Sequence, residues 1–197
     1  MKKEIIAFIP ARGGSKSIKN KNLKKLGKKN LVEITINQAL KSKLFSKIIL
    51  SSNSSSILKV GKKYKKIEIF KRPANISKDV SKTELAILNY FKNNKNYIAE
   101  YLIVLQVTSP LRKMKTLKKF ASHCISKKLK NCLTVTYKND HISKNQKYFN
   151  TLEQVNFRRR QDRKGFLIEN GMIYFLNIKE FLKRKTIYSK KWNYFIT

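Results

Sequence analysis

Acidic residues are scarce in this 197-residue chain. Asp and Glu together number 11 against 46 Lys and Arg, which gives a formal net charge of +35 at pH 7. An excess of that size raises nucleic-acid binding as a first hypothesis. Arginine is scarce too, since only eight of the basic residues are Arg. Lys, Asn and Ile are plentiful and all have A/T-rich codons, so genome composition explains much of the charge and no specific nucleic-acid partner is expected.

Long apolar runs are also missing. No run of 18 or more apolar residues occurs, so we expect no transmembrane helix. The opening segment MKKEIIAFIPARGG has an apolar stretch of about five residues, which is shorter than the hydrophobic region of a signal peptide. The sequence therefore predicts a cytoplasmic protein that does not associate with membranes.

Cysteine is nearly absent. Cys124 and Cys132 are too few for a disulfide framework. Together with His123 and His141 they show neither the C-x2-C nor the H-x3-H spacing of a zinc site, so zinc binding is not expected.

Short, β-branched apolar runs alternate along the chain with segments of helical periodicity. Such runs without polar alternation are typical of strands buried on both faces of a parallel sheet. The expected strands are residues 5–9, 47–50, 67–70, 101–106, 132–137 and 172–176, and the expected helices are 32–43, 54–63, 81–94 and 114–128. Ser81 followed by Glu84 resembles a capping box at the start of the third helix. The pattern predicts one α/β domain over residues 1–197 with a mostly parallel central sheet.

Residues 138–157 interrupt the alternation. The segment is polar and contains neither Pro nor Gly, and it precedes an Arg cluster. We interpret it as an arm that leaves the sheet and returns to it, not as a second domain.

The segment IPARGGSKSIKNKNL follows the first expected strand and is predicted to be a phosphate-binding loop. Gly13 and Gly14 let the backbone approach a ligand closely. Arg12, Lys16 and Lys21 place three cations beside the free N–H groups of the loop. The P-loop pattern G-x4-G-K-[S/T] is not satisfied, so a tight Gly-Gly turn with incidental lysines is the alternative. We favour polyphosphate binding.

The segment LQVTSPLR contains a second group of candidate residues. Gln106 ends the fourth expected strand, and ligands of open α/β sheets bind at the carboxyl ends of strands. Its side-chain amide can both donate and accept hydrogen bonds, so Gln106 is a candidate ligand residue. For Arg112 we expect a structural role, in which its guanidinium anchors the carbonyls of its own loop.

The third candidate segment is RRRQDRKGFLIENGMIYF, in which an Arg cluster precedes another expected strand. Gln161, Asn170 and Tyr174 are specific hydrogen-bonding groups in this stretch. An Arg beside such groups suits a ligand carboxylate better than a nucleic-acid backbone. A solvated basic face is the alternative.

In this order, the segments resemble the acylneuraminate cytidylyltransferases, or CMP-sialic acid synthetases. The loop matches the family's IPARGGSK followed by Ile-x-x-Lys-Asn, and LGKKNL resembles its Leu-Gly-x-x-Pro-Leu with Asn30 in place of Pro. RPANISKD, LQVTSPLR and the stretch from Arg160-Gln161 to NGMIYF resemble three further motifs of the family. Together the motifs cover almost the whole chain, and their order makes them far more specific than any one alone.

The resemblance implies a Rossmann-like three-layer nucleotidyltransferase fold whose arm mediates homodimerisation. It also implies transfer of CMP from CTP to the anomeric hydroxyl of an acidic nine-carbon 2-keto sugar, with release of pyrophosphate. The residues implied to bind CTP are Arg12, Gly13, Gly14, Ser15, Lys16, Lys21, Asn22, Arg72 and Thr83. Those implied to line the sugar pocket are Gln106, Arg160, Asn170 and Tyr174, and the implied catalytic residues are Arg12, Lys21 and Gln106.

The chain departs from the family where the resemblance implies Mg2+ binding. The C-terminal Asp-x-Asp motif that holds the ion in the family has no counterpart before Thr197, and Asn53 stands where the family has Asp. Mg2+ takes hard oxygen ligands, so the cofactor implied by the resemblance has no protein ligand identified in this sequence.

Two interpretations of the function follow. The chain is either an active enzyme that recruits Mg2+ mainly through the CTP phosphates, or a truncated or degenerate homologue that binds nucleotide with little turnover. A KDO-type cytidylyltransferase is a further alternative. The sequence leaves open whether the acid sugar is N-acetylneuraminate, legionaminate or pseudaminate.

Overall fold

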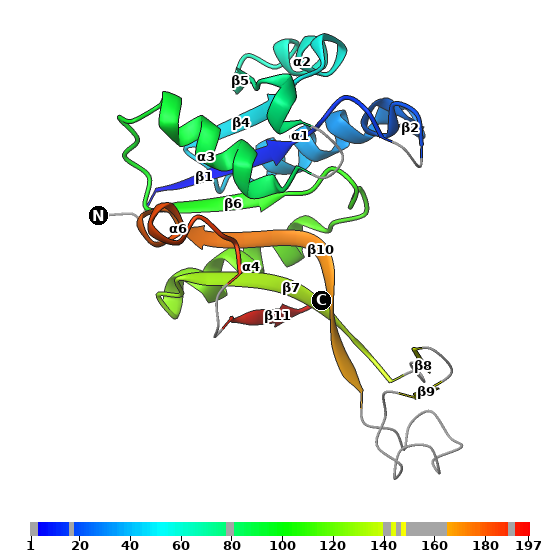
Figure 1. Ribbon diagram of the computed structural model, residues 1–197, viewed down its shortest axis with the longest axis vertical. Helices are drawn as coiled ribbons and strands as arrows, with labels where there is room; N and C mark the ends of the chain where they lie inside the picture. The colour runs from blue at the N-terminus through cyan, green and yellow to red at the C-terminus, as the bar shows by residue number, and fades with distance from the viewer. Residues whose placement is uncertain are drawn as a thin grey trace.

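A seven-stranded sheet forms the centre of the computed structural model, which describes residues 4–15, 18–77, 81–139, 143–144, 147–148, 165–188 and 192–197 (Figure 1). The strands of this sheet are β1 (Ile5–Pro10), β4 (Lys47–Ser52), β5 (Ile67–Lys71), β6 (Tyr101–Leu105), β7 (Asn131–Lys138), β10 (Phe166–Asn177) and β11 (Tyr194–Ile196). The helices are α1 (Leu31–Ser42), α2 (Ser55–Lys62), α3 (Thr83–Asn93), α4 (Met114–Ser126) and α6 (Ile178–Arg184), with short 3-10 turns η1 (Lys21–Leu23) and η2 (Ala74–Ile76). Two small hairpins complete the described elements: β2 (Lys25–Leu26) with β3 (Lys29–Asn30), and β8 (Ser143–Lys144) with β9 (Lys147–Tyr148).

The sheet has the order β11-β7-β10-β6-β1-β4-β5 and is mostly parallel. β5, β4, β1 and β6 pair in parallel, and so do β7 and β11. β10 runs antiparallel to both β6 and β7. The predicted α/β fold with a mostly parallel sheet is confirmed.

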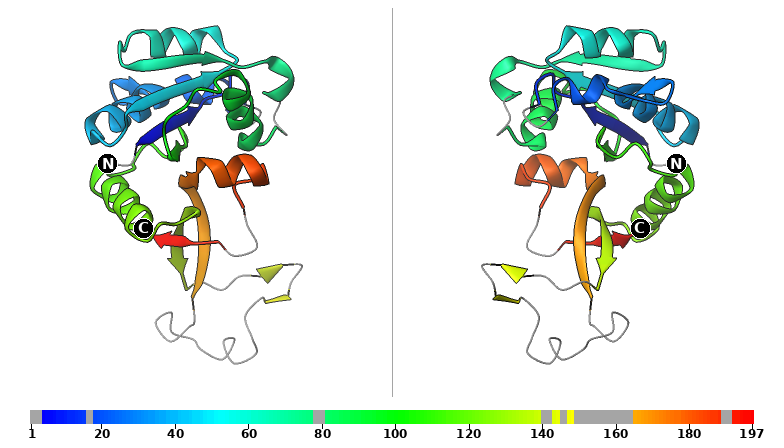
Figure 2. Two further views of the ribbon diagram at one scale, coloured as in Figure 1. Left: turned by 90° about the vertical axis from the view of Figure 1, so that its left-hand side faces the viewer. Right: turned by 90° about the vertical axis from the view of Figure 1, so that its right-hand side faces the viewer.

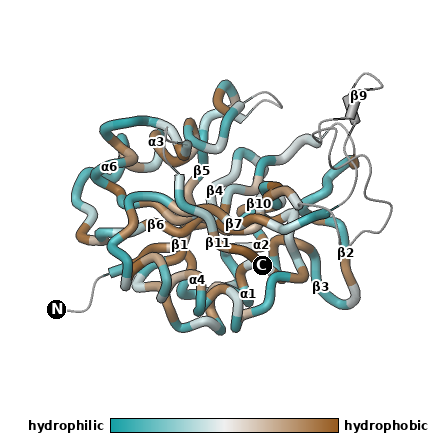
Figure 3. Tube along the Cα trace, turned by 90° about the horizontal axis from the view of Figure 1, so that it is seen from below, coloured by the Kyte–Doolittle hydropathy of each residue, from teal (hydrophilic) through white to brown (hydrophobic). Residues whose placement is uncertain are grey.

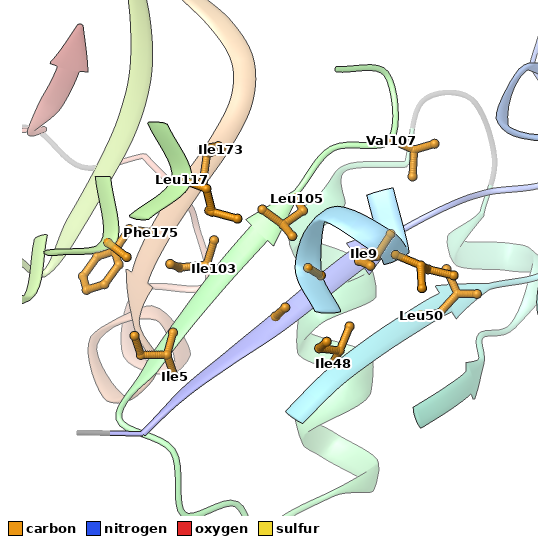
Figure 4. Packing of buried hydrophobic residues seen from close by; sticks show 14 of the residues in the cluster. Ile5, Ile9, Ile48, Leu50, Ile103, Leu105, Val107, Leu117, Ile173 and Phe175 are labelled. Atoms are coloured by element: carbon orange, nitrogen blue, oxygen red, sulfur yellow. The ribbon is translucent and has the colours of Figure 1, made fainter. Parts of the chain in front are cut away.

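Both faces of the sheet are covered by helices (Figure 2). Alternate residues of β1 show the division: Ile5 and Ile9 pack in one buried cluster with residues of α1, α2 and α4, whereas Ile6 and Phe8 pack with residues of α3 and α6. Figure 4 shows the first cluster, in which side chains from β1, β4 and β6 interdigitate with those of β10 and α4. The hydrophobic segments lie at the centre of the molecule and the hydrophilic ones outside (Figure 3). Burial on both faces explains why these strands are apolar without alternation.

All six predicted strands and all four predicted helices are present, and most of their ends lie within about two residues of the expected positions. The exception is β10, which begins at Phe166, well before the expected residue 172. The sequence did not indicate α6 or β11. The structure places α6 directly after β10, with Asn177 as its N-cap: the side chain of Asn177 accepts from the backbone N–H of Glu180 at 3.1 Å.

The predicted capping box at the start of α3 is wrong. Lys82 is the N-cap residue and its side chain makes no capping hydrogen bond. Glu84 is instead buried, and its carboxylate lies 3.5 Å from the backbone N–H of Ile187. The Glu84 carboxylate therefore contacts the segment after α6 instead of capping α3.

A complete capping box occurs at α1. Asn30 Oδ1 accepts from the backbone N–H of Glu33, and Glu33 Oε2 accepts from the backbone N–H of Asn30, both at 2.9 Å. Asn30 is the residue that replaces the family's Pro. The Asn30 side chain, which is of a type favoured at the N-cap position, thus caps the start of α1.

The predicted arm, residues 138–157, lies mostly outside the described residues. The outer ends of β7 and β10 extend from the body of the molecule toward the β8–β9 hairpin (Figure 1). Its part in dimerisation stays a prediction. None of the helices in the described ranges is long and apolar enough to cross a membrane.

Candidate nucleotide-binding site

A cavity of about 250 Å³ opens at the carboxyl ends of β1 and β6; we refer to it as the main cavity. It is lined by Pro10, Arg12, Gly14, Ser15, Lys21, Asn22, Arg72, Ile76, Ser77, Ser81, Thr83, Gln106, Val107 and Thr108. Eight residues predicted from the sequence are therefore brought together from separate segments: Arg12, Gly14, Ser15, Lys21, Asn22, Arg72, Thr83 and Gln106. The position agrees with the general rule that open α/β sheets bind ligands beyond the carboxyl ends of their strands.

The loop after β1 is tied to its surroundings at several points. The backbone N–H of Ala11 donates to Ser51 O at 2.9 Å, and the backbone N–H of Gly13 donates to Asn53 Oδ1 at 2.8 Å. From η1, Asn22 Nδ2 donates to Arg12 O at 2.9 Å. Asn53, noticed in the sequence only because it replaces a carboxylate, holds the loop in place through its amide oxygen.

The two glycines of the loop serve different purposes. A Cβ atom on Gly13 would lie 2.9 Å from Ser54 Cβ, so this position has no room for a side chain. A Cβ on Gly14 would have no atom within 4 Å, and Gly14 lines the main cavity whereas Gly13 does not. Gly13 thus allows the loop to pack against the start of α2, and Gly14 leaves space for a ligand.

Arg72 is a poorly compensated cation of the main cavity. Arg72 follows β5 and is 6% exposed, and its Nε has no hydrogen-bond partner within the described part of the chain. Burial, together with the positive charge of Arg12, lowers the pKa of Arg72 to about 10. No lining residue carries a carboxylate in this cavity as the structure describes it. Such an arrangement favours binding of a molecule rich in anionic or acceptor oxygens.

Arg112 fulfils the predicted role of structural anchor. Its Nη2 donates to Gln106 O at 2.6 Å and to Met172 O at 3.1 Å, and its Nη1 donates to Gln38 Oε1 at 2.8 Å. Burial lowers its pKa to about 10. The guanidinium fixes the backbone at Gln106, whose side-chain Nε2 lies 3.5 Å from Thr83 Oγ1 beside the main cavity.

Gln38 of α1 was missed by the sequence analysis. Its Nε2 donates to Pro110 O at 2.7 Å and to Arg112 O at 2.9 Å, across more than seventy residues of sequence. Gln38 therefore links α1 to the LQVTSPLR loop. Nothing in the helical pattern of residues 32–43 distinguishes Gln38 from an ordinary surface residue.

A second cavity of about 350 Å³, the side cavity, adjoins the first. It is lined by Ser81, Lys82, Thr83, Glu84, Gln106, Tyr174, Thr186, Ile187 and Tyr188, of which Ser81, Thr83 and Gln106 also line the main cavity. Of the predicted sugar-pocket residues, the structure brings Gln106 and Tyr174 here. Thr186 and Tyr188 were missed because the segment after α6 has no periodic pattern.

The structure does not bring Asn170 to either cavity. Its Oδ1 accepts from Thr134 Oγ1 at 2.7 Å, and its Nδ2 donates to Thr136 Oγ1 at 3.0 Å and to Thr197 Oγ1 at 2.8 Å. The amide thus connects β7, β10 and the C-terminal end of β11. Lys16, Arg160 and Gln161 lie outside the described residues.

The expected Mg2+ ion finds no suitable donor set in the described ranges. The main cavity offers amides, hydroxyls and cations, and no group of three or more His, Cys, Asp or Glu gathers anywhere in the described residues. Asn53 Oδ1 is already occupied by the N–H of Gly13. Because Mg2+ prefers carboxylate and phosphate oxygens, these residues do not fit it as protein ligands.

Comparison with known proteins decides the family. Residues 6–195 match the family model described as cytidylyltransferase. The chain belongs to the cytidylyltransferase family.

Two curated relatives are similar to this chain in sequence. The chain is 45% identical over 76 residues to the CMP-N,N'-diacetyllegionaminic acid synthase of Campylobacter jejuni, a match that covers 39% of the chain and 32% of the relative. It is 28% identical over 198 residues to the N-acylneuraminate cytidylyltransferase of Streptococcus agalactiae, covering 94% of the chain and 46% of the relative. These relatives support the resemblance found from the motifs.

A solved structure of a CMP:2-keto-3-deoxy-manno-octonic acid synthetase complexed with CTP superposes with a TM-score of 0.71. The match covers 98% of this chain and 90% of that protein, at 12% sequence identity. At this identity the likeness shows the cytidylyltransferase fold alone.

Proposed function

We propose that this cytidylyltransferase transfers CMP from CTP to the anomeric hydroxyl of a sialic-acid-like 2-keto sugar acid. The observation that carries the proposal is the pair of cavities that share Ser81, Thr83 and Gln106. The lining of the first includes three cations, and the lining of the second includes the hydroxyl groups of two tyrosines and Thr186 together with Lys82 and Glu84. Two substrates bound in adjoining cavities can react where the cavities join.

In the main cavity, Arg12, Ser15 and Lys21 are proposed to hold the triphosphate against the open backbone at Gly14. From the resemblance alone, Lys16 is proposed to contact it as well. Asn22 is proposed to contact the ribose, and Arg72 with Thr83 the cytosine. The unpartnered Nε of Arg72 supports a role in binding, because a desolvated donor gains a partner when acceptor atoms of the ligand arrive.

The proposed reaction is an in-line displacement at the α-phosphorus. The hydroxyl oxygen of the sugar forms a bond to phosphorus and loses its proton, while the bond to the bridging oxygen breaks and pyrophosphate leaves. Negative charge grows on the non-bridging and leaving oxygens, so Arg12 and Lys21 would stabilise the transition state electrostatically. Gln106, at the junction of the cavities, would orient the sugar through its amide.

The direct test is pyrophosphate release from CTP in the presence of Mg2+ and single sugar acids. N-acetylneuraminate, legionaminate, pseudaminate and KDO are supplied in turn, with a reaction lacking sugar as the control. Release that depends on a nine-carbon acid supports the proposal, and preference for KDO would assign the chain to the KDO type. Absence of release with every acid would refute it.

None of the described lining residues of the main cavity carries a carboxylate, which favours one alternative, a homologue that binds nucleotide with little turnover. Thermal stabilisation by CTP without pyrophosphate release would identify it, because a ligand that binds the folded state raises its melting temperature. We further propose, from the resemblance alone, a cytoplasmic homodimer that uses Mg2+; sedimentation of the purified chain tests the dimer.

A further inference from the structure

Two tyrosines of the side cavity share one carboxylate. Tyr174 donates its hydroxyl proton to Glu169 Oε1 at 2.6 Å, and Tyr188 Oη lies 3.1 Å from Oε1 and 3.2 Å from Oε2 of the same residue. Glu169 and Tyr174 lie on β10, and Tyr188 lies in the segment after α6. The carboxylate therefore joins two parts of the chain at the wall of the cavity.

The partners of Glu169 are unusual for this chain. Basic residues outnumber acidic ones by 46 to 11, yet no ion pair to Glu169 occurs within the described ranges. The three described ion pairs, by contrast, involve Glu68 and Glu180 with nearby Lys or Arg. A carboxylate bound by two phenols in so basic a protein points to a function for the phenols.

The direction of these hydrogen bonds fixes what the phenols offer to a ligand. An ionised carboxylate only accepts, so each tyrosine must donate its proton to Glu169. Burial and the negative charge of Glu169 raise the pKa of both phenols, which keeps them protonated near neutral pH. Each oxygen then retains its acceptor capacity, and both tyrosines line the side cavity.

We propose that Glu169 is a positioning residue that makes Tyr174 and Tyr188 a paired acceptor site for the hydroxyl and acylamino N–H groups of the sugar acid. The inference rests on the proposed function, since it takes the side cavity as the sugar site. Two fixed acceptors select ligands with donors at matching positions. They disfavour a ligand carboxylate at the same place, so the acid group of the sugar must face another part of the cavity.

Three variants test the inference. Glu169→Gln removes the charge and gives the phenols a competing donor, and Tyr188→Phe removes one acceptor. Glu180→Gln is the matched control, because Glu180 loses the same charge but pairs with Lys130 and Arg184 outside both cavities. The KM for the sugar acid is expected to rise about three- to tenfold in the first two variants, the loss of one neutral hydrogen bond. The KM for CTP is expected to stay within twofold, and the control is expected to match the wild type.

The readouts separate this inference from the proposed function. Suppose that the wild type turns over a sugar acid. If the first two variants then keep the KM for the sugar acid within twofold of the wild-type value, or raise the KM for CTP as much as the KM for the sugar acid, the inference is overturned and the function stands. If the wild type shows no turnover, calorimetric titration with N-acetylneuraminate in the presence of CTP decides. Binding that weakens in Glu169→Gln and Tyr188→Phe but not in Glu180→Gln supports the inference although the function fails. Absence of binding to the wild type overturns both.

Discussion

Arg72 and Arg112 offer a matched pair of substitutions with opposite expected effects on stability. Both side chains are buried, 6% and 4% exposed, and the pKa of each is lowered to about 10. The Nε atoms of both side chains lack a partner in the described part of the chain. Three hydrogen bonds anchor the Nη atoms of Arg112, whereas Arg72 lies near the positive charge of Arg12. Replacing each by Met, which is similar in length and uncharged, separates the two situations.

The expected magnitudes follow from the pKa values and the hydrogen bonds. A fall in pKa from 12.5 to about 10 corresponds to about 3 kcal/mol of destabilisation, an upper limit because water in the cavity screens the charge. Arg72→Met should therefore leave the free energy of unfolding unchanged or raise it by about 1–3 kcal/mol. Arg112→Met relieves a similar desolvation cost, but it deprives Gln38 Oε1 and Met172 O of the guanidinium donor and leaves Gln106 O with the N–H of Ser109 at 3.3 Å. It should therefore lower the free energy of unfolding and leave it about 3 kcal/mol or more below that of Arg72→Met.

The pH dependence of the difference has a definite sign. The folded-state pKa of Arg72 lies below its unfolded value, so the destabilisation is complete below about pH 10 and declines only as the pH rises from there toward 12.5. The stability difference between Arg72→Met and the wild type should therefore be constant from pH 6 to pH 9.

Thermal unfolding followed by circular dichroism, with calorimetric titration of CTP, measures these effects. A change of 1 kcal/mol shifts the melting temperature by about 2–4 °C in a chain of this size. Arg72→Met should melt at or above the wild-type temperature and bind CTP at least about tenfold more weakly. Equal destabilisation by both substitutions, or unchanged CTP affinity in Arg72→Met, would refute the assignment of Arg72 as an uncompensated ligand residue.

Three further predictions concern the loops that frame the main cavity. Gly13→Ala should lower the free energy of unfolding by about 1–3 kcal/mol, because its Cβ would meet Ser54. Gly14→Ala should melt like the wild type but bind CTP more weakly. Equal melting temperatures of the two variants would contradict these different roles of the glycines. Arg12→Ala should weaken CTP binding in calorimetry, and unchanged affinity would exclude Arg12 as a phosphate ligand. Gln38→Ala should lower the free energy of unfolding, measured by urea titration, by about 2 kcal/mol, since the carbonyls of Pro110 and Arg112 lose their donor. A decrease below about 0.5 kcal/mol would show that Gln38 does not hold the loop.

The sequence predicted the parts of the fold whose signal is local. Strands such as β1 and β6 are short apolar runs bounded by turn residues, and their burial on both faces leaves that signature. The edge strand β11 has only three residues, of which Phe195 alone is partly buried, so it carries no such pattern. The seven-residue helix α6 follows β10 without an intervening turn segment, which hid its start.

The site residues show the same difference between local and long-range signals in the sequence. Arg12 and Lys21 come close to the cavity within one continuous motif, so the motif sufficed to select them. Contacts across long sequence separations were not visible: Asn53 meets Gly13 across 40 residues, and Gln38 meets Arg112 across 74. Asn170 shows the converse case, because the motif marked it as a ligand residue while its amide bonds to three threonines.

The central claim is that the loop after β1 binds the triphosphate of CTP. A crystal structure of the protein soaked with CTP tests it most directly. The account predicts phosphate oxygens within hydrogen-bonding distance of Arg12 and Lys21, beside the open backbone at Gly14, and cytosine near Arg72. A nucleotide bound elsewhere, or a loop closed on its own side chains with the main cavity empty, would contradict it.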